Sequence, residues 1–154
     1  MNVYKKILKN IRLLILFVIF VCIFAFGYKF FIIIGDSMHP SQANLDIVLV
    51  NKLSYDFETP KEGDVIVFWD YSDAEFLIKR VIGVPGDTIE IIEGFIFKNN
   101  KLYFDEFSHI NLNGGISHHP DVLGEKEYWV IGDNRDGTWY GVIHEDQIVG
   151  QYYE

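Results

Sequence analysis

Residues 95–104 read FIFKNNKLYF, and this stretch decides the class of fold that we expect. Two short runs rich in aromatic and large apolar residues flank the pair Asn99-Asn100, and such runs favour strands. Because asparagine tolerates the positive φ angles of a tight turn, the pair predicts a β-hairpin.

The same pattern continues on both sides of this hairpin. Runs of Val, Ile, Phe and Tyr alternate with clusters of Gly, Pro, Asn and Asp, and no run has a convincing period of 3.6 residues. We therefore predict an all-β fold, one compact antiparallel unit. The predicted strands are Leu45 to Lys52, Asp64 to Trp69, Glu75 to Val84, Thr88 to Ile92, Phe95 to Lys98, Leu102 to Phe104, Glu127 to Ile131 and Gln147 to Tyr152.

Residues 105–126 lack periodicity and predict a long loop. The loop contains the pair His118-His119, but adjacent side chains on an extended chain diverge, and no other ligand stands at a convincing spacing. We therefore expect no metal, and no other motif indicates a cofactor.

The N-terminal part of the chain is apolar and predicts a membrane anchor. No charge interrupts Leu13 to Tyr28, and with Lys29 extended outward the apolar stretch reaches Ile34, about 22 residues, enough to span a bilayer. We predict a cytoplasmic N-terminus (1–12), a transmembrane anchor (13–34) and an extracytoplasmic β domain (35–154). A cleaved signal peptide is the alternative, with a cut after Gly27.

Charge supports this orientation. The first 35 residues contain five basic residues and no acidic one, and four of the five precede the apolar run. Basic residues of this kind mark the cytoplasmic side of a membrane helix. The remainder carries all 22 acidic residues, which argues against a nucleic-acid surface because binding phosphates needs clustered Lys and Arg.

Three segments of the chain are candidates for chemistry. Residues 35–40 read GDSMHP, residues 76–87 read FLIKRVIGVPGD and residues 129–141 read WVIGDNRDGTWYG. Taken singly, each has a structural interpretation: a turn that leaves the membrane, an edge strand with a solvated lysine and a hairpin turn. Strand alternation places Leu77, Lys79 and Val81 on one face, so that apolar neighbours flank the lysine and burial would lower its pKa.

Together, the three segments resemble the signature boxes of type I signal peptidases. The boxes are Gly35-x-Ser37-Met38-x-Pro40, Lys79 to Asp87 and Gly132-Asp133-Asn134-Arg135, with Asp46 to Lys52 and Gly63 to Phe68 as further similar segments. They follow the order of the family, and the anchor stands in the expected place.

The resemblance implies a Ser/Lys dyad on an all-β fold, with Ser37 as the nucleophile and Lys79 as its general base. The oxyanion hole is implied to use the backbone N–H groups of Gly35 and Ser37. Thr138, Arg80 and Asp133 are implied to support the dyad, and the apolar substrate pockets to use Phe31, Ile33, Met38 and Ile78.

The implied substrates are the signal peptides of exported preproteins, cut after a small residue with another small residue two positions earlier. An extended peptide that pairs with exposed backbone presents alternate side chains to shallow pockets, which explains this spacing. The implied partner is therefore a signal peptide at the lipid bilayer, and we expect the chain to act as a monomer.

The match departs from the family after Arg135, where about four residues are missing. The family continues through a Ser to Asp-Ser-Arg and then Gly, whereas this chain runs from Thr138 through Trp139-Tyr140 to Gly141. Thr138 stands for the family's Ser in one alignment, Asp136 for its Asp in the other, and the Arg has no counterpart. This departure keeps open an alternative function, a non-catalytic or narrowly dedicated membrane-tethered β-module that assists assembly of one exported substrate.

Overall fold

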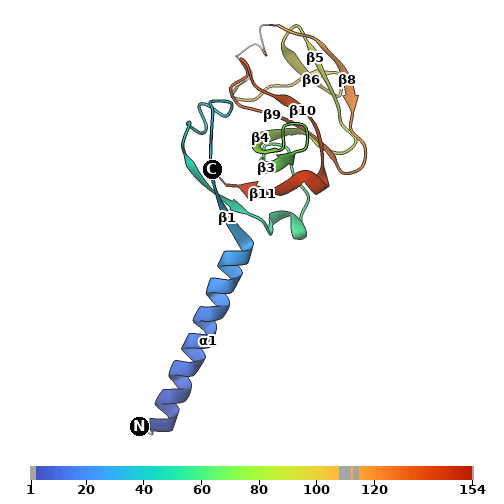
Figure 1. The fold of residues 1–154 in the computed structure, drawn as a ribbon. Helices are drawn as coiled ribbons and strands as arrows, with labels where there is room; N and C mark the ends of the chain where they lie inside the picture. Colours follow the sequence, from blue (N-terminus) through green and yellow to red (C-terminus); the bar gives the residue numbers. More distant parts are fainter. Residues whose placement is uncertain (1–2, 108–111, 113–114, 154) are drawn as a thin grey trace.

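The computed structural model describes residues 3–107, 112 and 115–153. One long helix, α1 (Val3–Gly27), leads into a β domain that contains all the described strands. The helix projects away from this domain, with the N-terminus at its far end (Figure 1). The predicted class, an all-β domain after one N-terminal apolar helix, is confirmed.

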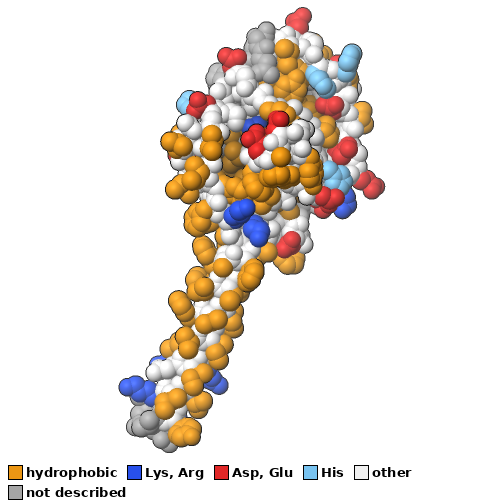
Figure 2. All heavy atoms as spheres, in the orientation of Figure 1, with side chains coloured by type: hydrophobic (Ala, Val, Ile, Leu, Met, Phe, Trp, Pro, Cys, Tyr) orange, Lys and Arg blue, Asp and Glu red, His pale blue; other side chains and the backbone are white. Residues whose placement is uncertain are grey.

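Helix α1 is the only described helix that is long and apolar enough to cross a membrane. An 18-residue window of the helix has a mean hydropathy of 2.5, and residues 4–26 are exposed. Figure 2 shows hydrophobic side chains along the helix and Lys or Arg side chains towards both of its ends. The helix ends against Lys52, whose backbone N–H donates to Gly27 O at 2.8 Å and whose Nζ donates to Phe26 O at 3.2 Å. These bonds satisfy carbonyls that the helix end leaves open.

The helix ends before the predicted C-terminal end of the anchor at Ile34. Helix α1 stops at Gly27, and the next residues form strand β1 (Tyr28–Ile32), which pairs antiparallel with β2 (Ile47–Asn51). An apolar run of this kind suits a helix or a buried strand equally. Residues 28–32 form a strand because β2 supplies the partners for their backbone hydrogen bonds. The assignment of the flanking regions to the two sides of a membrane stays a prediction.

Two antiparallel sheets make up the domain. The larger one has the strand order β1-β2-β11-β3-β4-β9-β10 and the smaller one the order β7-β6-β5-β8. The remaining strands are β3 (Val65–Asp70), β4 (Glu75–Gly83), β5 (Thr88–Ile92), β6 (Phe95–Lys98), β7 (Lys101–Leu102), β8 (His118–Val122), β9 (Glu127–Ile131), β10 (Tyr140–His144) and β11 (Ile148–Tyr152), with 3₁₀ turns η1 (Ser54–Asp56) and η3 (Glu145–Gln147).

The structure confirms the eight predicted strands, each end within two residues of its predicted position, and adds three more. The Asn99-Asn100 hairpin is confirmed, with positive φ angles of 53° and 61°. Besides β1, the prediction missed β10 and β8, so the predicted 105–126 loop is wrong at 118–122; residues 108–111 and 113–114 lie outside the described part. β8 contains Pro120 and lacks alternation, and its pairing with β5 makes it a strand.

The larger sheet curls, and its curl leaves two strand edges facing each other. Its inner face buries Ile33, Val48, Val50 and Val67, with Ile78 packed against them. β1 pairs only with β2, and β4 pairs with β9 only from Arg80 onward. Among the described residues, no strand pairs with the outer edge of β1 or with residues 75–79 of β4 on the β9 side. Unpaired strand edges accept an additional strand.

Candidate active site

Ser37 and Lys79, the predicted nucleophile and base, lie next to each other. Ser37 follows β1 and Lys79 lies in β4, 42 positions apart in sequence, yet Lys79 Nζ is 2.7 Å from Ser37 Oγ. The ammonium or amine group also donates to Ile78 O at 3.0 Å. A separation of about 2.6–3.2 Å is what proton transfer between a hydroxyl and a base requires.

Lys79 lies in an environment that disfavours its charge. Its side chain is 2% exposed, and burial lowers its pKa to about 8, whereas the negative charges of Asp133 and Glu75 act in the opposite direction. Burial dominates because the ammonium loses most of its hydration. A lysine of this pKa is partly neutral near pH 7 and can accept a proton.

The loop that follows β9 holds the backbone around Ser37. The Asn134 N–H donates to Ser37 O at 3.1 Å, and Asn134 Nδ2 donates to Asp36 O at 3.1 Å. Gly132 makes this approach sterically feasible, because a Cβ at that position would lie 2.2 Å from Ser37 O and 2.2 Å from Thr138 Oγ1. The predicted Gly132–Arg135 box therefore holds the backbone of Asp36 and Ser37 through the main chain and side chain of Asn134.

Arg80, the residue after Lys79, forms a buried ion pair with Asp133. Arg80 Nε and Nη2 each donate to the Asp133 carboxylate at 2.8 Å, in the bidentate geometry typical of Arg and carboxylates. Arg80 Nη1 donates to Gly63 O at 2.9 Å, and Ser41 Oγ donates to Asp133 Oδ2 at 2.5 Å. This pair links β4, the turn after Ser37 and the loop after β9.

Replacing Asp133 by asparagine is expected to destabilise the domain by about 3 kcal/mol, because it removes the buried counter-charge of Arg80. It is also expected to lower the pKa of Lys79 further, since the Asp133 carboxylate now raises it. Denaturant unfolding and a pH–rate profile measure the two effects, with the exposed Asp136→Asn as the matched control. An Asp133→Asn variant as stable as the control would contradict the structural role.

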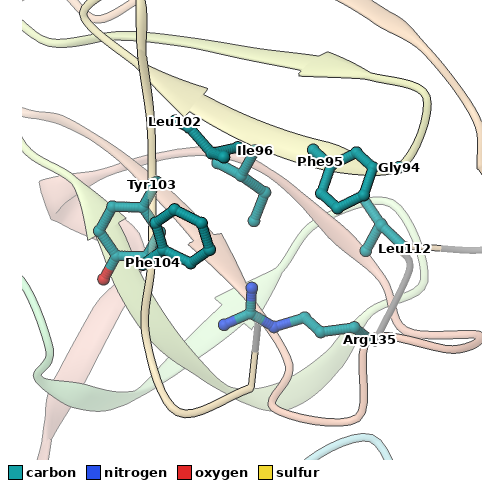
Figure 3. Close-up of a pocket in the computed structure, with 8 residues that line it drawn as sticks. All are labelled: Gly94, Phe95, Ile96, Leu102, Tyr103, Phe104, Leu112 and Arg135. Carbon is teal, nitrogen blue, oxygen red and sulfur yellow. The ribbon is translucent and has the colours of Figure 1, made fainter. Parts of the chain in front are cut away.

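Arg135, the last residue of the box, points away from the dyad. Its guanidinium reaches into a small pocket lined by residues of β6, β7 and neighbouring loops (Figure 3). There it forms an ion pair with Asp105, and its Cζ lies 5.8 Å from the centre of the Phe107 ring. Arg135 therefore connects the larger sheet to the smaller one and supports the site only through its loop.

A groove of about 200 Å³ extends from the dyad between the two free strand edges. One wall is the segment 31–34, the other is the segment 76–79, and Val48 and Val67 also line it. Of the four predicted pocket residues, Phe31, Ile33 and Ile78 line this groove. Met38 does not, because it is 0% exposed and belongs to the core under the Ser37 turn.

Of the predicted oxyanion donors, Ser37 lines the groove and Gly35 lies two residues before it. Gly35 has a φ of +101°, a conformation that favours glycine, and its N–H donates to Asn44 Oδ1 at 2.9 Å. The Ser37 N–H donates to no atom of the part of the chain that the structure describes. The role of Gly35 as a donor therefore requires Asn44 to release it, and both roles stay predictions.

The structure favours one of the two alignments of the shortened box. Thr138 is 4% exposed and its hydroxyl lies over Gly132 beside the Ser37 carbonyl, whereas Asp136 is exposed. The Thr138 hydroxyl also donates to Trp139 O at 3.2 Å. Thr138 is thus the residue of this segment that the fold brings to the dyad.

Sequence reasoning missed Ser41, Asn44 and Phe76 as parts of the site. Ser41 contacts a carboxylate 92 positions away and Phe76 contacts Phe31 across the groove. No local pattern marks such residues, because their contacts arise only when distant strands come together. Alternation along β4 was the one usable signal, since it placed Phe76 on the Ile78 face.

Comparisons with known proteins show the family to which the chain belongs. The family model described as "Signal peptidase, peptidase S26" matches residues 5–153. The chain is 36% identical to "Signal peptidase I V" of Bacillus subtilis over 75% of this chain and 78% of that protein. It is 32% identical to "Signal peptidase IB" of Staphylococcus aureus, covering 87% and 82%. A "Probable signal peptidase I-2" of Synechocystis is 29% identical, and the chain spans 66% of its length.

Among solved structures, a signal peptidase I from Enterococcus faecalis matches 61% of this chain and 97% of its own, with 20% identity and a TM-score of 0.49. Fold and site together define a β-sheet hydrolase with a serine beside a buried amine. The chain belongs to the signal peptidase family, peptidase S26, and is a serine peptidase.

Proposed function

We propose that this protein removes N-terminal signal peptides from exported preproteins, with Ser37 as the nucleophile and Lys79 as the general base. The observation that carries the proposal is the 2.7 Å contact between Lys79 Nζ and Ser37 Oγ. It lies at one end of a groove between two free strand edges, where an extended peptide can add as a strand.

The dyad accounts for both halves of the reaction. Neutral Lys79 takes the proton of the Ser37 hydroxyl as the oxygen attacks the scissile carbonyl carbon, and then protonates the departing amine. The product is an ester between Ser37 and the signal peptide. Lys79 next takes a proton from water as the water oxygen attacks the ester carbonyl carbon. It then returns this proton to the departing Ser37 oxygen, which releases the signal peptide with a free carboxyl end and restores the Ser37 hydroxyl and the neutral amine. With a pKa of about 8, about a tenth of the Lys79 side chains are neutral at pH 7.

The groove supports a preference for small residues before the cut bond. Its walls are backbone edges, and the buried Ile33, Val48 and Val67 leave little depth beneath them. In an added strand, every second side chain points towards this floor. Small residues at positions −1 and −3 therefore fit, as in Ala-x-Ala sequences.

We further propose that α1 crosses the membrane with its N-terminus in the cytoplasm and the β domain outside. The basic residues before the apolar run favour this orientation. β1 begins directly after the helix, so the groove would open near the membrane surface, where the cleavage point of a signal peptide emerges.

Cleavage of a labelled preprotein tests the proposal. The wild-type protein in detergent is expected to cut an Ala-x-Ala preprotein after the second alanine, and to cut a matched substrate with Phe at −1 at least about 100-fold more slowly because the groove is shallow. Mass spectrometry identifies the new N-terminus, and the Ser37→Ala variant, assayed in parallel, is the negative control. A wild type that cleaves neither substrate would refute the proposal and favour the tethered, non-catalytic module.

A further inference from the structure

An aromatic pair closes the groove at the end remote from the dyad. The rings of Phe31 and Phe76 meet across the groove in a T-shaped contact with centroids 5.2 Å apart. Trp69 packs against Phe76 with centroids 4.7 Å apart and so supports the ring. β1 and β4 both run from this pair towards the dyad, which makes Phe31 and Phe76 an end wall.

Lys29 adds a positive charge to this wall. Its Nζ lies 4.6 Å from the centre of the Phe31 ring and 4.7 Å from that of Phe76. The side chain is exposed and, among the described residues, forms no ion pair with a carboxylate. Glu75, the neighbour of Phe76, points to the opposite face of β4 by strand alternation. The charge is therefore available to a bound peptide.

The distance from the wall to the dyad sets how many peptide residues the groove holds. Phe76 and Lys79 are three positions apart in one strand, which corresponds to about 10 Å. An extended peptide whose residue −1 lies at Ser37 therefore reaches the wall with residue −4. The cavity lies on this side of the dyad, so the recognised residues before the cut bond occupy it.

We propose that Lys29, Phe31 and Phe76 form a subsite for residue −4 of the substrate, which favours acidic and neutral side chains and disfavours basic ones. This inference rests on the proposed function. The rings contact the stem of the −4 side chain where the peptide leaves the groove, and the ammonium of Lys29 attracts a carboxylate or repels a second cation at that point.

The test uses full-length protein in a zwitterionic detergent and four peptides that differ only at position −4, which is Glu, Gln, Leu or Lys. The wild type is expected to cleave the Glu peptide with a kcat/KM about fivefold to tenfold above that of the Lys peptide, the size expected for a solvent-exposed charge at this range. The ratio is expected to fall to about one in Lys29→Met, to invert in Lys29→Glu and to decrease with added salt.

Two controls isolate the effect. Lys52→Met removes a charge that lies at the end of α1 instead of over the groove, and is expected to keep the wild-type ratio. The same four residues placed at −6 are expected to give no preference.

A wild-type ratio of one, or a ratio unchanged in Lys29→Met, overturns the subsite while leaving the proposed function intact. An equal loss on all four peptides in Lys29→Met also overturns it, in favour of a general contact such as a lipid headgroup. Failure to cleave any peptide overturns both proposals.

Discussion

Replacing Lys79 by methionine is expected to lower kcat/KM by about 10³-fold, because the Ser37 hydroxyl loses the base that takes its proton. Methionine is similar in length and carries no charge, so the substitution removes the amine without opening a large cavity. Ser37→Ala is expected to cause a loss at least as large. The double variant is expected to be no worse than the poorer single variant, because residues that act as one unit are non-additive.

The same substitution is expected to stabilise the fold at pH 7, by about 1–3 kcal/mol. The pKa of Lys79 falls from 10.5 to about 8 on folding, so the wild-type folded state is destabilised by a buried charge below pH 8. Methionine removes this destabilisation but also loses the hydrogen bonds of the amine, which reduces the net gain in stability. The destabilisation declines between pH 8 and 10.5, where the folded state releases its proton first, and the gain from methionine declines with it.

Denaturant unfolding at pH 7 and at pH 10 checks this change, and the wild-type pH–rate profile checks its origin. Wild-type kcat/KM is expected to rise with pH through about 8 as Lys79 becomes neutral. A methionine variant that is both inactive and less stable than the wild type at pH 7 would contradict a desolvated base, since its loss of activity would then follow from damage to the fold.

Replacing Gly132 by alanine is expected to lower kcat by about 100-fold or more. The added methyl group would lie 2.2 Å from Ser37 O and 2.2 Å from Thr138 Oγ1, so the backbone of one loop must move. A displacement of about 1 Å at a catalytic group has this effect on rate. Stability is expected to fall by about 1–3 kcal/mol, as in other overpacked sites.

Gly141→Ala is the matched control for this clash. Its Cβ would approach only the Trp139 ring, at 3.3–3.4 Å, and no backbone must move. Adding Thr138→Ala to Gly132→Ala is expected to restore little activity, because the contact with the Ser37 carbonyl remains. Steady-state kinetics together with thermal unfolding separates misplacement of Ser37 from global loss of structure. Wild-type kcat in Gly132→Ala would show that the loop adjusts without moving the dyad.

The amino-acid sequence was sufficient to predict the class of fold and the positions of most strands, and it singled out Ser37 and Lys79, which lie in contact in the structure. These features are local: strand runs and turn residues such as Asn99-Asn100 act over a few positions. The motifs around Ser37, Lys79 and Gly132 carry the resemblance to a family in the same local way. A local pattern did not predict the end of the helix, because the apolar run through Ile34 suits a helix and a strand equally.

Which residues come into contact depends on the tertiary structure. Residues 28–32, at the end of the predicted anchor, pair with β2, and residues 31–34 line one wall of the groove. The curl of the larger sheet placed Ser37 against Lys79 and Phe31 against Phe76, and it buried Met38 while leaving Lys29 over the rings. Backbone pairing and packing between strands distant in sequence fix these contacts, so no local pattern encodes them.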